Sequence, residues 1–188
     1  MTSKSEEKLT IKKPDPERLR NLYSILGQVL DGLWFLEAEK EMGFDKAFEI
    51  DEKVWKIYAS KETKRILSIL LDRSVRNTDI PKKKVLEILE EILKISLFNQ
   101  SIQYEINKNE EMATLNFKVV DCKTLKGMKK VGRPLNQAKK ICKDIGIAYY
   151  ENMASTLHPG LRVECVSIPN SYNIDKNPIL CEWKFYFI

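Results

Sequence analysis

The stretch SIQYEINKNEEMATLNFKVV, residues 101–120, decides the fold, because the spacing of its apolar side chains changes there from helical to alternating. Apolar and polar positions alternate in residues 101–106 and 113–120, and the intervening residues 107–111 are polar. A period of two predicts strands, and the short polar connection predicts a turn. We therefore predict a β-hairpin where a helical half of the chain meets a sheet-containing half.

The residues before the hairpin have the pattern of helices. Residues 17–42 carry an apolar stripe at spacings of three and four, formed by Leu19, Leu22, Tyr23, Leu26, Leu30, Leu33 and Trp34. Such a stripe is typical of an amphipathic helix that packs against a core. Residues 45–58, with a continuation over 66–71, and residues 82–98 predict two further helices.

The residues after the hairpin show both helical and alternating patterns. We expect a basic loop at residues 123–133, a helix at 135–157, and two more strands at 161–168 and 180–187. The sum is an α+β protein in which N-terminal helices precede a mostly antiparallel sheet of about four strands, with helix 135–157 packed on it. We expect a flexible tail at 1–16 and one domain at 17–188, with a helical half (17–98) and a sheet-containing half (99–188).

Composition narrows the class of protein. Of the 188 residues 43% are hydrophobic and 31% charged, which is typical of a globular protein. No apolar run approaches the roughly 20 residues that cross a bilayer, so we expect a cytoplasmic protein without a membrane partner. Residues 118–143 hold nine basic residues and one acidic residue, Asp121. A solvated surface or an anionic small ligand explains this segment as readily as nucleic acid does, since no nucleic-acid-binding motif accompanies it.

All four cysteines, Cys122, Cys142, Cys165 and Cys181, lie in the second half of the chain. Reduced cysteines serve as metal ligands, as small buried side chains or as reactive thiols, and all three roles are open here. Thiolates suit zinc or, as the alternative, an iron–sulfur cluster, and four of them from separate elements can complete a tetrahedral site. Their wide spacing matches no standard zinc finger.

Two pairs of short motifs resemble a known grouping. The segments VEC (163–165) and CEWKF (181–185), together with GLWFL (32–36) and GFDKA (43–47), resemble the 4-vinyl-reductase domains and the L-2-amino-thiazoline-4-carboxylic acid hydrolase family, and most closely an uncharacterised archaeal and bacterial family in that grouping. The resemblance implies a domain that holds a small molecule, sometimes with a metal. In the related phenol-sensing activators three cysteines and a glutamate bind zinc. The connection between Cys165 and Cys181 is longer here than is usual in the grouping.

Glu37 and three aromatic residues complete the set of candidate site residues. Helical counting returns Glu37 to the middle of the leucine stripe, so we expect it to point inward and to join the cysteines as a metal ligand; solvation at the helix end is the alternative. Trp34, Phe35 and Trp55 are expected to line a ligand pocket, with burial in the core as the alternative.

The leading hypothesis from sequence is a cytosolic small-molecule-binding or sensor-like domain with a zinc site drawn from the four cysteines and Glu37. The alternative, implied only by the resemblance, is a hydrolase of cyclic cysteine-like or amide compounds, in which Cys142 or a metal-bound water with Glu37 would attack. A nucleic-acid-binding module is the third. The only histidine, His158, precedes Pro159 and Gly160 and is expected to be a turn residue rather than a partner of Cys142. A homodimer is compatible with the sequence.

Overall fold

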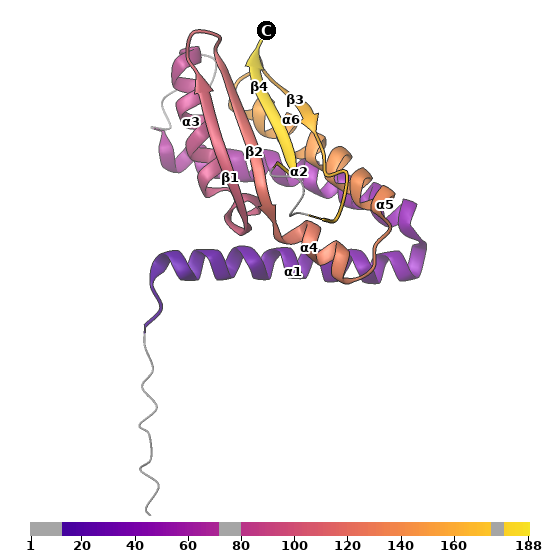
Figure 1. Cartoon of the computed structure of the whole chain (residues 1–188). Helices are drawn as coiled ribbons and strands as arrows, with labels where there is room; N and C mark the ends of the chain where they lie inside the picture. Colours follow the sequence, from indigo (N-terminus) through magenta and orange to yellow (C-terminus); the bar gives the residue numbers. More distant parts are fainter. Residues whose placement is uncertain (1–12, 72–79, 174–178) are drawn as a thin grey trace, which may run out of the picture.

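Four antiparallel strands form one sheet, and helices pack behind it (Figure 1). The computed structural model describes residues 13–71, 80–173 and 179–188. The strands are β1 (Ile102–Asn109), β2 (Thr114–Cys122), β3 (Leu161–Ser167) and β4 (Cys181–Phe187), in the order β1-β2-β4-β3. The predicted hairpin and the α+β class are confirmed. Residues 1–12 of the predicted tail lie outside the described residues.

The first half of the chain forms three helices. Helix α1 (Pro16–Met42) begins after Asp15, whose carboxylate accepts hydrogen bonds from the backbone N–H groups of Glu17 and Arg18, and it ends at Gly43, whose φ of 81° suits glycine. Helix α2 (Phe44–Leu70) includes the predicted helix 45–58 and nearly all of its predicted continuation over 66–71. Helix α3 (Lys82–Ile95) leads through the 3₁₀ turn η2 (Phe98–Ser101) into the sheet.

The core lies between the sheet and helices α2, α3 and α6 (Gly146–Leu157). Alternate residues of the central strands point into it and are almost fully buried, including Phe117 on β2 and Phe185 on β4. They meet aliphatic side chains such as Leu89 of α3 and Met153 of α6. Alternation on two central strands and a helical stripe on α3 therefore produce one continuous hydrophobic core.

One prediction about the segment after the hairpin is corrected, and another is confirmed. The expected basic loop is helix α4 (Lys123–Lys130), because Leu125 and Met128 are buried on one side of it and the Cys122 sulfur accepts a hydrogen bond from the Leu125 backbone N–H. The predicted helix at 135–157 is confirmed with the same bounds, and it contains a π-helical turn: α5 (Leu135–Lys140) continues through η3 (Ile141–Ile145) into α6.

The prediction that the leucine stripe of α1 packs on the core is wrong. Only Ser24 and Phe35 of this helix are buried, whereas the large apolar side chains of the stripe face solvent. Polar contacts hold the opposite side of α1 to the body of the fold: Ser24 Oγ donates to the Leu97 carbonyl at 2.6 Å, and Gln28 Nε2 donates to the Phe98 carbonyl at 3.0 Å. Helical spacing shows which residues share one side of α1. It does not show which side faces the body of the fold, and here the side with the hydrogen bonds of Ser24 and Gln28 does so.

Within the ranges that the structure describes, we find no helix with both the length and the apolar character that a bilayer crossing demands.

Gly146, at the start of α6, is required by the packing of Trp183. A Cβ atom built at Gly146 would lie 2.6 Å from the indole ring, which is buried beneath the helix. We expect Gly146→Ala to destabilise the protein by roughly 1–3 kcal/mol and to lower the Tm by several degrees. Gly127→Ala on α4 is the matched control, because nothing lies within 4 Å of the added methyl group. Thermal denaturation of both variants checks this, and equal Tm values would contradict it.

Candidate functional site

A cavity of about 140 Å³ lies where α1 and α2 meet the π-helical turn η3, helix α6 and the adjoining ends of β2 and β4. It is mainly apolar, with a few polar groups at defined places on its wall. A concave apolar pocket with convergent polar groups is the usual form of a small-molecule site. Its wall includes aromatic rings, carboxyl groups and thiols.

Aromatic side chains from four elements form one wall. Trp55 of α2 meets Phe98 of η2 and Tyr149 of α6 in edge-to-face contacts, with ring centroids 5.7 and 5.8 Å apart. Tyr150 continues the wall to Trp183 of β4, at 4.8 Å. All five side chains line the cavity. Edge-to-face packing of this kind holds large rings in fixed orientations, so this wall is rigid.

Buried Glu62 of α2 fixes one end of that wall. Its carboxylate accepts hydrogen bonds from Tyr149 Oη at 2.5 Å and Tyr58 Oη at 3.0 Å, and from the Leu97 backbone N–H at 2.7 Å. Three donors satisfy the carboxylate and tie α2, α6 and the start of η2 together. Glu62 thus holds the Tyr149 ring in its orientation on the cavity wall.

Two carboxyl groups face the cavity from adjacent helices. Asp31 belongs to α1 and Asp51 to α2, and the Trp55 side chain lines the cavity beside them. Burial raises the pKa of Asp31 from 3.8 to about 6. Burial, together with the charge of Asp31, raises the pKa of Asp51 to about 7. The two groups repel each other when both are ionised, so the pair retains a proton near neutral pH.

Three of the four cysteines also line the cavity. Cys122 ends β2, Cys181 begins β4, and Cys142 lies in η3. Burial raises the pKa of the Cys122 thiol, and it raises that of Cys181 to about 12. Burial raises the pKa of Cys142 as well, and the neighbouring sulfurs of Cys122, Cys181 and Cys165 add to the shift. The thiols are therefore neutral at physiological pH, and the four sulfurs are close enough to influence one another electrostatically.

Cys142 lies in a π-helical turn of the cavity wall. A turn with i→i+5 hydrogen bonds inserts one extra residue into a helix and rotates the residues after it, and such turns are frequent at functional sites. Ile141, Cys142 and Ile145 of η3 line the cavity, followed by Gly146. Gly146 then brings the helix close enough to Trp183 to close the wall.

The remaining predicted site residues lie elsewhere. Glu37 is 68% exposed and forms an ion pair with Lys40 at 2.6 Å, so the expectation that it points inward is wrong. The helix presents that whole side to solvent. Cys165, on edge strand β3, lies outside the lining of the cavity, and its sulfur donates to the Ser167 carbonyl. Trp34 is 48% exposed on the outer side of α1.

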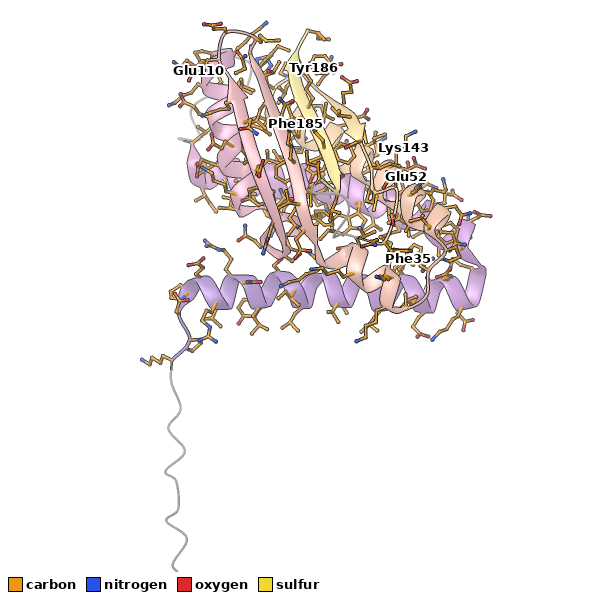
Figure 2. All side chains as sticks on the ribbon, in the orientation of Figure 1. Phe35, Glu52, Glu110, Lys143, Phe185 and Tyr186 are labelled. Atoms are coloured by element: carbon orange, nitrogen blue, oxygen red, sulfur yellow. The ribbon has the colours of Figure 1, made fainter. Side chains whose placement is uncertain are left out.

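Phe35 and Trp55 have different surroundings from each other. Phe35, labelled in Figure 2, is buried against Ala47, Phe48 and Ile145 and lies beneath the Arg133 guanidinium, 5.0 Å from its ring centroid. It belongs to the core rather than to the cavity wall. Of the three aromatic residues predicted from sequence, Trp55 lines the cavity.

No three or more His, Cys, Asp and Glu side chains are arranged as ligands of one metal ion in residues 13–71, 80–173 and 179–188. His158 lies at the far end of α6, where Nδ1 accepts a hydrogen bond from the Gly160 backbone N–H at 2.9 Å and the ring packs against Phe187. The prediction that His158 is a turn residue is confirmed.

Sequence reasoning missed Asp31 and Asp51. A signal for Asp51 was present: Ala47, Asp51 and Trp55 follow one another at four-residue intervals, and Ala47 and Asp51 are buried. A carboxylate within the buried stripe of a helix requires a partner and therefore indicates a site. Asp31 had no such signal, because it lies opposite the leucine stripe and looked like an ordinary exposed residue.

The family model described as a family of unknown function (DUF6125) matches residues 25–187. The chain belongs to this family. The match includes every residue that lines the cavity, from Gln28 to Trp183. No curated protein matches the chain.

The carboxyl pair predicts an unusual pH dependence of stability. A folded-state pKa raised from 3.8 to about 7 means that Asp51 favours folding below about pH 4 and that this contribution disappears as the pH rises through 7. We expect Asp51→Asn to unfold at a Tm roughly 5–10 °C above the wild type near pH 8, and at the same Tm near pH 4. Asp45→Asn, an exposed change on the same helix, is the control. Parallel curves of Tm against pH for wild type and Asp51→Asn would contradict the assignment.

The neutral thiols predict slow alkylation. Because the thiolate is the reactive form, we expect Cys142 and Cys181 to react with iodoacetamide near pH 8 on the order of 100 to 1,000 times more slowly than in the unfolded chain. Burial raises the pKa of Cys165 too, and the charge of Lys143 offsets part of this rise; because Cys165 also lies outside the cavity, it should react first. Timed labelling followed by peptide mass spectrometry measures each rate, with denatured protein as the reference. Native rates equal to denatured rates would refute the assignment.

Proposed function

We propose that this protein is a small-molecule-binding, sensor-like domain whose ligand occupies the cavity between α1, α2, η3, α6 and the sheet. The observation that carries the proposal is an aromatic cavity with two desolvated carboxyl groups on one part of its wall. A buried carboxyl pair destabilises the fold at neutral pH, and a bound partner is the usual reason for keeping such groups. A cavity of about 140 Å³ is close to the ~150 Å³ that accommodates benzene in an engineered protein, so the ligand is of single-ring size.

The chemistry of the wall favours a ligand with a protonated nitrogen. A cation beside Asp31 and Asp51 would stabilise both ionised carboxylates and would displace the proton that they share. The faces of Trp55 and Tyr149 attract a cation in addition. The thiols of Cys122, Cys142 and Cys181 are neutral at this pH and offer a soft, weakly polar surface to the apolar part of the ligand.

Zinc bound by cysteines stays a prediction from the sequence. Cys122, Cys142 and Cys181 line one cavity, which favours it, but the described residues do not place three ligands around one point, and Glu37 lies on the exterior. Zinc would have to draw the sulfurs together and displace their protons. The proposal therefore treats these thiols as part of a neutral wall, and elemental analysis of protein purified without added metal distinguishes the two states.

The alternative functions have less support. A hydrolase would need an activated nucleophile, and burial instead raises the pKa of the Cys142 thiol. A nucleic-acid-binding surface would use the cations of residues 118–143, and four of the nine, Lys118, Lys126, Arg133 and Lys140, pair with acidic side chains. Free cysteines at all four positions agree with a reducing, cytoplasmic location, which we also propose.

Three matched probes test the proposed ligand chemistry. Benzylamine, benzyl alcohol and benzoate each contain one benzene ring and differ in charge. Differential scanning fluorimetry near pH 8 therefore separates the effect of ligand charge on the Tm from the effect of the ring. We expect benzylamine to raise the Tm by at least about 2 °C at millimolar concentration, and benzoate to leave it unchanged. In Asp51→Asn the benzylamine response should fall to that of benzyl alcohol. Equal responses to all three probes in the wild type would overturn the proposed charge preference.

A further inference from the structure

Helix α1 exposes a continuous apolar face along about half of its length, over residues 22–34. It lies along one edge of the molecule with the rest of the fold on one side only (Figure 1), and its outer side chains project into solvent (Figure 2). We call this face the α1 stripe. Its large members are between 47% and 70% exposed, and they are Leu22, Tyr23, Leu26, Val29, Leu30, Leu33 and Trp34.

The α1 stripe differs from the scattered apolar residues of ordinary surfaces. Its members recur at spacings of three and four over residues 22–34, so they form one ridge of about three and a half turns. The side of α1 that faces the body is instead attached by polar groups, including Ser24, Gln28 and Glu39. Contiguous apolar patches of this size mark interaction sites, because exposure to water is costly over such an area.

We propose that the α1 stripe is a homodimer interface in which two copies of this chain pack their α1 helices antiparallel. Seven large side chains that are about half exposed present on the order of 600–700 Å². Each partner in a stable protein complex contributes about 800 Å², so the ridge and its flanks supply most of the area that a dimer needs. A two-fold axis near Leu26 and Leu30 would place one ridge on the other.

Charges at the two ends of the α1 stripe favour the antiparallel arrangement. Arg18 and Arg20 flank its beginning. Glu37 and Glu41 lie on the same face at its end, where Lys40 pairs with Glu37 at 2.6 Å and leaves a net charge of −1 among the three. Antiparallel packing brings the arginines of one copy beside the glutamates of the other, whereas parallel packing places like charges together. It also aligns the two helix dipoles favourably.

Charge also argues against a membrane surface as the occupant. Helices that lie on anionic lipid are rich in Lys and Arg beside their apolar face. Helix α1 has three basic side chains and five acidic ones, and two of the acidic residues, Glu37 and Glu41, lie at the end of the α1 stripe itself. A second copy supplies the complementary arginines, which a lipid surface does not.

Sedimentation equilibrium of the full-length protein at micromolar concentration tests the interface. We expect the wild type to be a dimer and Leu30→Glu to raise the dissociation constant at least about 100-fold, because one leucine is lost from each copy. Met112→Glu is the matched control: Met112 is 65% exposed in the β1–β2 turn, against 70% for Leu30, and this variant should remain a dimer. Far-UV circular dichroism verifies that each variant is folded.

A charge exchange tests the antiparallel arrangement. Arg20→Glu should weaken the dimer, and the double variant Arg20→Glu with Glu37→Arg should restore at least part of the lost affinity. A monomeric wild type would overturn the proposal, and co-flotation of that monomer with anionic vesicles would assign the stripe to a membrane. A dimer that withstands Leu30→Glu would overturn it too, and absence of rescue in the double variant would reject the antiparallel arrangement.

Discussion

The attachment of α1 by its polar side is the constraint on which the rest of the structure depends. Ser24 and Gln28 bind backbone carbonyls just before the sheet begins, and Gln28 Oε1 also accepts a hydrogen bond from Thr124 Oγ1 of α4. Toward the other end, Glu39 forms a two-pronged ion pair with Arg133, whose side chain is only 5% exposed. A buried arginine without its carboxylate would cost several kcal/mol, so these contacts hold the helix in one rotational setting.

That rotational setting produces both the cavity and the exposed ridge. With Gln28 turned inward, Asp31 follows on the same side one turn later and reaches the cavity next to Asp51. The leucines occupy the remaining side and are left in water. The carboxyl pair and the α1 stripe thus both follow from this one rotational setting of α1. Each of them lowers the stability of a monomer that has neither a ligand nor a partner.

The sequence predicted the parts of the fold that depend on local periodicity. Alternation in residues 101–120 identified β1 and β2, and the stripe of α3 identified a helix that is indeed buried. The α1 stripe obeyed the same rule but faces outward, because periodicity tells which residues share a side and not what that side meets. The π-helical turn at Ile141–Ile145 has no recognisable pattern of its own, so the position of Cys142 relative to Cys122 and Cys181 could not be read from spacing.

The sequence predicted the cysteines of the candidate site but not its two aspartates, for a related reason. Cysteine is a candidate metal ligand or nucleophile wherever it occurs, and three of the four cysteines do line the cavity. Asp31 and Asp51 looked like two of many surface acids, since the sequence does not state that α1 and α2 bring them together at one cavity. Helix α1 carries Asp31 on its inner side and the α1 stripe on its outer side. The proposed cation at the carboxyl pair would therefore contact the same helix that would hold a second copy. A ligand shifts an assembly equilibrium only by its differential affinity for the two states, and a shared helix is the simplest physical route to such a difference.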